Sequence, residues 1–96
     1  MNPIPLSDET AALARRLVWF ETPEESLADP VRFLAYAFAR ATHEDMNVLR
    51  RYLSEADFRE ALLQAPPGII DARSWCYWHV RLGLNPASPM PVRKFG

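Results

Sequence analysis

Helix-start signals recur along this chain and constrain its fold more than any other feature of the sequence. At six points a Ser, Thr or Asp stands directly before a helical pattern, where its side chain can accept a hydrogen bond from a free backbone N–H group. These residues are Ser7, Thr22, Asp29, Thr42, Ser54 and Asp71. They predict helices over about 8–20, 30–41, 43–53 and 55–64, a short helical turn from 23 to about 28, and a last helix that Asp71 caps and Gly83 terminates.

The remaining patterns favour an all-α fold. The sequence has no alternating strand pattern and no Asn-Gly or Asp-Gly hairpin turn, and its 96 residues suffice for one domain. We predict a single compact bundle of five to six short helices over residues 1–83. Helix 30–41 should lie at its centre, because apolar residues cover most of its circumference. The prolines at 86, 89 and 91 favour an extended proline-containing C-terminal tail over residues 84–96.

The net charge of the chain does not favour binding to nucleic acid or to an anionic membrane. Twelve acidic residues oppose eleven basic ones, for a net charge of −1. Residues 1–45 hold eight acids and four bases (−4), and residues 46–96 hold four acids and seven bases (+3). This mild asymmetry could steer a partner, although ordinary solvated helix faces also explain it.

The cellular location is predicted from what the sequence lacks. One cysteine excludes an internal disulfide and suits a reducing compartment. The N-terminal residues show neither a basic region nor an apolar run, so we expect no signal peptide, and no apolar segment approaches the ~18 residues of a membrane span. We therefore expect a cytoplasmic protein without a membrane partner.

The last predicted helix is apolar on nearly every side. At 100° per residue, Trp75, Trp78 and Leu82 share one face, while Cys76 and Val80 fall on a second. Such a helix must be buried, and in a short chain another molecule could supply part of the cover.

In the first helix, Trp19 falls on the side of the basic residues 15 and 16, which indicates either a packed helix end or a contact residue.

No combination of residues indicates catalysis, a cofactor or a metal. Cys76 and His79 are three apart on one helix, but a structural zinc site needs four ligands, and the second histidine, His43, falls on a face that we expect to be exposed. A nucleophilic cysteine needs a base on a different element. Cys76 is thus interpreted as a small apolar filler and His79 as a partly buried ring.

The carboxylate pairs Glu24-Glu25 and Glu44-Asp45 lie in first helical turns, where capping explains them.

A DNA-binding regulator acting as a homodimer is the alternative function. Residues 43–64 could form a helix-turn-helix, with Arg50, Arg51 and Arg59 near the recognition helix. The second helix of this pair, however, carries three acids against one arginine, an unfavourable balance near phosphates. Binding of nucleic acid by this protein alone is therefore not expected.

The surface predicted to bind a partner combines the last helix with the tail. Aromatic and arginine side chains commonly dominate binding energy. They point to a site made of Trp78, Arg81, Val92, Arg93 and Phe95. Two other interpretations of the tail stay open: folding back against the tryptophans, and fraying in solution.

Two long patterns in the chain resemble a known group of proteins. The first is Trp-Phe-Glu-Thr-Pro-Glu-Glu-Ser-Leu over 19–27 with Asp-Pro-x-Arg-Phe-Leu over 29–34. The second is Asp-Ala-Arg-Ser-Trp-x-Tyr-Trp-His over 71–79, then Leu-Gly at 82–83 and Pro-x-Pro-Val-Arg over 89–93. Together they resemble small bacterial proteins encoded beside abortive-infection-type nucleotidyltransferase toxins. The resemblance implies a small helical antitoxin-like protein that binds another protein, and it supplies no catalytic residue.

Overall fold

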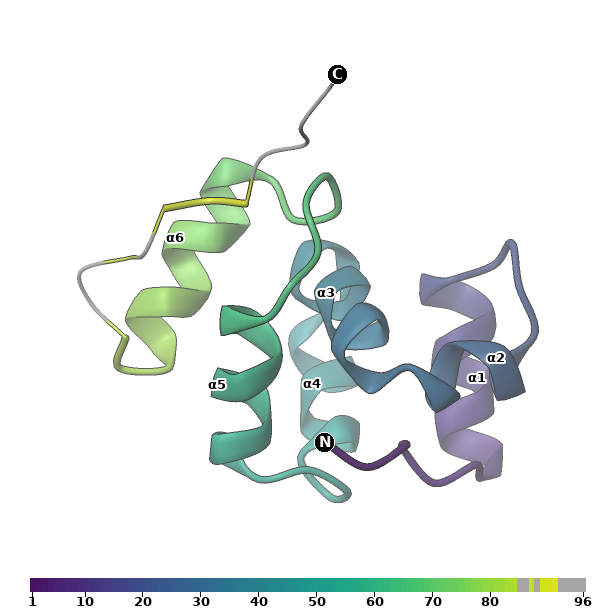
Figure 1. Cartoon of the computed structure of the whole chain (residues 1–96). Coiled ribbons are helices and arrows are strands. Elements are labelled where there is room, and N and C mark those ends of the chain that lie inside the picture. The colour runs from purple at the N-terminus through teal and green to yellow at the C-terminus, as the bar shows by residue number, and fades with distance from the viewer. Residues whose placement is uncertain (85–86, 88, 92–96) are drawn as a thin grey trace.

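The computed structural model describes residues 1–84, 87 and 89–91, and it shows six α-helices arranged as one compact unit (Figure 1). The helices are α1 (Asp8–Leu17), α2 (Pro23–Ala28), α3 (Pro30–Arg40), α4 (His43–Leu49), α5 (Glu55–Leu63) and α6 (Ala72–Arg81). No strand occurs among the described residues, which confirms the all-α prediction. None of the helices in this part of the chain has the length and apolar character needed to cross a membrane.

The six predicted capping residues all begin helices. In each case the side chain of the capping residue accepts a hydrogen bond from a backbone N–H group of the first helical turn. At Ser7, Thr42 and Ser54 a side chain in the first turn also bonds back to the backbone N–H of the cap, which completes a capping box. Local hydrogen bonding therefore explains why each helix starts where it does.

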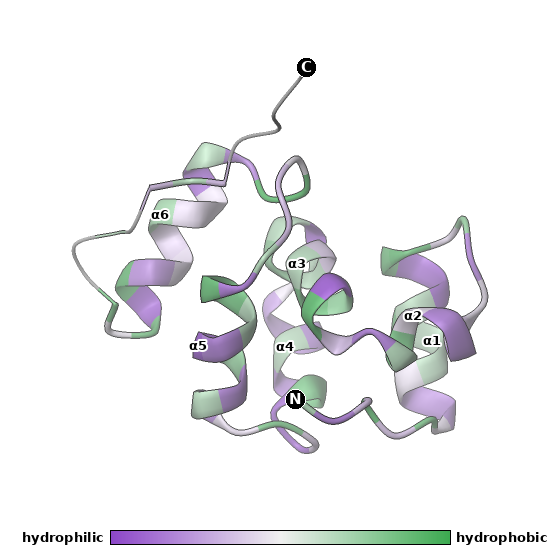
Figure 2. Cartoon of the chain, viewed as in Figure 1, coloured by the Kyte–Doolittle hydropathy of each residue, from purple (hydrophilic) through white to green (hydrophobic). Residues whose placement is uncertain are grey.

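Helix α3 is central, as predicted. It packs against α1, α2, α5 and α6, and its residues Phe33, Leu34 and Phe38 are buried. Figure 2 shows hydrophobic and hydrophilic residues interspersed along α5 and α6. This pattern is expected for a helix that buries one face and exposes the other. The N-terminal segment joins the same core, since Ile4 is buried and its N–H group donates to the Leu27 carbonyl at 3.0 Å.

Two helices end earlier than predicted. Helix α1 was expected to reach residue 20, but Val18 already leaves the helical conformation (φ −131°, ψ 64°). The Arg40 guanidinium donates to the Leu17 carbonyl at 3.0 Å, where the next helical N–H group would otherwise bond.

Helix α4 was expected to reach residue 53. It ends at Leu49 because residues 50–52 tighten into a turn, and the Tyr52 hydroxyl donates to the Glu9 carboxylate on α1.

The end of α6 agrees with the sequence. Gly83 has φ +72°, its N–H group bonds to the Val80 carbonyl, and the Leu84 N–H group bonds to the His79 carbonyl at 2.7 Å. This is a Schellman motif, which favours glycine at the left-handed position. Beyond it, Leu84 and Met90 pack against the core. The predicted binding residues Val92, Arg93 and Phe95 lie outside the described residues.

Candidate functional site

The two predicted binding residues on α6 lie in different environments. Trp78 is 9% exposed, and its indole Nε1 donates to the Phe38 carbonyl at 2.9 Å. Its ring therefore serves mainly to join α6 to α3, and little of it is available to a partner. Arg81 is exposed in the last turn of α6.

The outer face of α6 is more exposed than its sequence indicates. Tyr77 and Val80 are 53% and 64% exposed, and Cys76 is exposed too, so its interpretation as an apolar filler is wrong. His79 is fully buried, with its Nδ1 2.7 Å from the Trp75 carbonyl. Cys76 thus faces solvent while His79 faces the core, although the two are only three residues apart on α6. No group of three or more His, Cys, Asp or Glu residues that could hold a metal occurs in the described part of the chain.

The arginines of the possible helix-turn-helix are engaged within the protein. Arg50 pairs with Glu55, and Arg51 pairs with Glu9 on α1 at 2.8 Å. The Nε of Arg59 donates to the Leu82 carbonyl at 2.9 Å. Contacts with DNA phosphates would have to compete with these bonds.

Among the described residues, the most exposed aromatic side chain, Trp19, lies in the turn between α1 and α2. Trp19 is 73% exposed and Phe20 is 46% exposed. The interpretation of Trp19 as a packed helix end is therefore wrong, because α1 stops before it and the ring stands outside the core. Two adjacent exposed aromatic rings form a contiguous apolar patch, and such patches are candidate interaction sites.

Ring contacts hold this surface together. Phe20 meets Trp19 edge to face at 5.4 Å between ring centroids, and it meets Tyr36 on α3 in the same manner at 5.6 Å. Arg32 lies over both Phe20 and Tyr36, and Arg40 lies over Tyr36 at 5.0 Å. We call these five residues, Trp19, Phe20, Arg32, Tyr36 and Arg40, the Trp19 platform. Edge-to-face and cation–π contacts of this kind fix the orientation of the rings.

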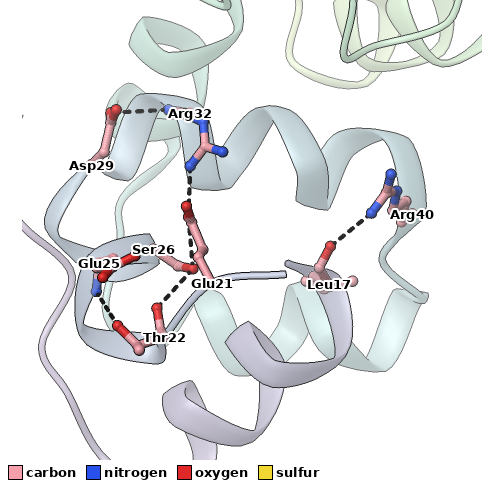
Figure 3. A network of polar contacts seen from close by, with 8 residues as sticks. All are labelled: Leu17, Glu21, Thr22, Glu25, Ser26, Asp29, Arg32 and Arg40. Atoms are coloured by element: carbon pink, nitrogen blue, oxygen red, sulfur yellow. Dashed lines mark hydrogen bonds and ion pairs between the residues drawn. The ribbon is translucent and has the colours of Figure 1, made fainter. Parts of the chain in front are cut away.

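Polar bonds fix the two arginines in turn (Figure 3). Arg32 pairs with the Glu21 carboxylate at 2.6 Å, and the Ser26 hydroxyl donates to the same carboxylate at 3.0 Å. The hydrogen bond from Arg32 lowers the pKa of the Glu21 carboxyl, although burial opposes the shift. Arg40 is held by its bond to the Leu17 carbonyl. The platform therefore rests on a preformed network between α1, α2 and α3.

An open hollow borders the platform. It is lined by Trp19, Phe20, Glu21, Thr22 and Glu25. Glu21 is occupied by Arg32, but the Glu25 carboxylate has no hydrogen bond or ion pair among the described residues, although its backbone N–H bonds to Thr22. An exposed indole beside a free carboxylate can receive an apolar group and a cation together.

The sequence contains a signal for this surface that the helical pattern obscures. Thr22 and Pro23 mark the start of a new helix, so a turn must fit before them. A helix that continued to residue 20 would leave one residue for that turn. Ending α1 earlier places Trp19 and Phe20 in a loop, where exposed aromatic side chains are candidate binding residues.

No protein-family model, curated protein or solved structure matches this chain.

Proposed function

We propose that this chain is a non-enzymatic cytoplasmic protein that binds a partner protein through the Trp19 platform. The observation that carries the proposal is the exposure of Trp19 and Phe20, 73% and 46%, on a base that other residues hold rigid. Trp, Tyr and Arg are the residue types that most often dominate binding energy at interfaces. The earlier surface built on Trp78 is less suitable, because that ring is nearly buried.

The hollow beside the platform indicates the chemistry of the partner. The indole of Trp19 offers an apolar face, and the Glu25 carboxylate adds a negative charge beside it. Glu24 in the same helical turn is also exposed. We infer a partner surface that is apolar at its centre and carries a Lys or Arg at its edge.

A second copy of this chain fits the surface poorly. A two-fold contact through the platform would bring the same patch of each copy together, so the Glu24-Glu25 turns would face each other or lie near each other. Close like charges oppose association. A different protein with a basic group avoids this repulsion.

The nature of the partner comes from the sequence resemblance. The stretch over 19–27, which contains Trp19 and Glu25, is part of the pattern that resembles antitoxin-like proteins. We propose that the partner is a nucleotidyltransferase-type toxin encoded by the adjacent gene, and that binding neutralises or regulates it.

Titration calorimetry with the product of the adjacent gene tests the proposal. Trp19→Ala should weaken binding by about 30-fold or more, the loss expected at a hot spot of ~2 kcal/mol. Tyr77→Ala, which removes a comparably exposed ring from α6, should leave the affinity unchanged. If Trp19→Ala binds as tightly as the parent protein while Arg81→Ala does not, the interface is on α6 and the platform assignment is wrong.

The charge of the partner is tested separately. Glu25→Lys should weaken binding more than Glu44→Lys, a matched reversal in the first turn of α4. Equal effects of the two reversals would contradict the inference of a basic group at the edge of the partner surface. Failure of the adjacent gene product to bind the parent protein would refute the antitoxin-like assignment.

A further inference from the structure

A pocket of about 390 Å³ lies between the first half of α6 and the junction of α3 with α4. It is distinct from the Trp19 platform and shares no residue with it. Pockets of roughly 300–1,000 Å³ are the usual size for small-molecule sites. One wall comes from α6, and the other comes from the end of α3, the start of α4 and the short connection between them, Ala41 and Thr42.

The floor of the pocket is aromatic and rigid. Phe38 and Trp78 are buried with ring centroids 5.2 Å apart, and the Trp78 indole N–H is fixed by its bond to the Phe38 carbonyl. Met46 is also buried there. Tyr77, half exposed, meets Trp78 edge to face at 5.1 Å and forms part of the wall. A flat apolar ring can pack on such a floor without first ordering it.

The rim of the pocket is polar and favours an anion. Arg73 lines it from α6, and His43 lines it from the start of α4. Thr42 and Ser74 line the same walls, and the Thr42 hydroxyl oxygen accepts the Asp45 backbone N–H as the cap of α4. Arg73 forms no ion pair among the described residues, and no carboxylate lines the pocket.

The neighbouring acids bond elsewhere or lie outside the lining of the pocket. Asp71 accepts the hydrogen bond of the Ser74 backbone N–H as the cap of α6, and Asp45 is paired with Arg16. Glu44 is exposed beside His43 but does not line the pocket. The lining residues thus carry the positive charge of Arg73 and no negative one.

We infer that this pocket binds a small aromatic carboxylate. The ring contacts the half-exposed Tyr77 and the small exposed parts of Phe38 and Trp78, and the carboxylate accepts hydrogen bonds from Arg73. The inference does not depend on the protein-binding role of the Trp19 platform, because the two sites are made of different residues.

Three indole compounds with short side chains of different charge test the inference. Indole-3-acetate, indole-3-acetamide and tryptamine carry a negative, a neutral and a positive group on the same ring. Their binding to the full chain is followed by NMR, through the shift of the Trp78 indole N–H signal. We expect the acid to bind tightest and the amine weakest, and we expect the Trp19 indole signal to stay in place.

Two variants locate the binding. Arg73→Gln should weaken the binding of indole-3-acetate by about fivefold and leave the binding of the amide unchanged, because only the charged hydrogen bond is lost. Arg15→Gln on α1 is the matched control and should change neither. Ala39→Leu, which fills the pocket from α3, should weaken all three compounds.

Each remaining outcome overturns the inference. Equal affinity for the three compounds would show that the rim does not select an anion. Unchanged binding of the acid to Arg73→Gln would show that the ligand lies elsewhere, and so would a shift of the Trp19 signal instead of the Trp78 signal. Absence of binding by the acid at millimolar concentration would show that the pocket has no such ligand class.

Discussion

Replacement of Asp45 by Asn should destabilise the protein in a pH-dependent way. Asp45 is 6% exposed and receives two hydrogen bonds from the Arg16 guanidinium on α1, at 2.8 and 2.5 Å. It also accepts the Thr42 backbone N–H at 3.0 Å as part of the capping box of α4. An asparagine keeps the size of the side chain and one acceptor oxygen, but it loses the charge. The variant therefore isolates the ionic part of the contact.

The size of the effect follows from the pKa of Asp45. The hydrogen bonds from Arg16 are the main cause that lowers this pKa from 3.8 to about 2, against the opposing effect of burial. A fall of this size corresponds to about 2 kcal/mol of stability at neutral pH. Because the Arg16 side chain is 54% exposed, solvent screening reduces the expected loss to about 1–2 kcal/mol. For a domain of this size that is a fall in Tm of roughly 4–15 °C.

The pH dependence decides whether the charge is responsible. The folded-state pKa is lower than the unfolded one, so the contribution of Asp45 is complete above about pH 5 and is lost as the pH falls toward about 2. Urea unfolding of both proteins between pH 7 and pH 3 should show the difference in unfolding free energy shrinking by about half at pH 3. A difference that stays constant over this range would refute the ionic explanation and assign the loss to packing or capping geometry.

Three other changes test separate parts of the structure. Trp78→Phe should cost about 1–3 kcal/mol of unfolding free energy, since it leaves the buried Phe38 carbonyl without its donor; a smaller loss in urea unfolding would contradict this role. Gly83→Ala should cost about 1 kcal/mol through backbone strain at φ +72° alone, because no atom lies within 4 Å of the added Cβ; unchanged stability would argue against the Schellman geometry. Acrylamide should quench the fluorescence of Trp19 far more than that of the buried Trp75 and Trp78, so Trp19→Phe should remove most of the quenchable signal; if it does not, Trp19 is shielded in solution.

The sequence predicts the starts of helices in this protein better than their ends. A start depends on a single residue and the next three, as at Ser54 and Asp71, and such local information is complete in the sequence. The end of α1 is marked in the sequence only indirectly, by the Thr22-Pro23 start of α2, and it coincides with a bond from Arg40, 23 residues away, to the Leu17 carbonyl. The end of α4 likewise coincides with a bond between Tyr52 and Glu9 on another helix. Contacts of this kind are not visible until the chain is folded.

The same limit explains which site residues were missed. Helical periodicity correctly places Trp75 and Trp78 on a buried face, but it cannot say that Cys76 and Val80 on the other face stay exposed. It also assigns Trp19 to a helix that does not reach it. The platform requires Tyr36 to approach Phe20 from α3, a contact between helices that the sequence does not encode locally.

The arginine bonds that shorten and anchor α1 also support the proposed site. Arg16 joins the last turn of α1 to α4 through Asp45, and Arg40 joins the final carbonyl of α1 to α3. Both bonds act on the end of α1 from which the Trp19 turn begins, while Arg40 also lies over Tyr36 in the platform. The exposed rings are therefore held by interactions that stabilise the fold itself, so a partner would not have to order them on binding. Because Trp19 is largely exposed, its removal should cost little folding stability, so a loss of affinity in Trp19→Ala would report on the proposed binding role alone.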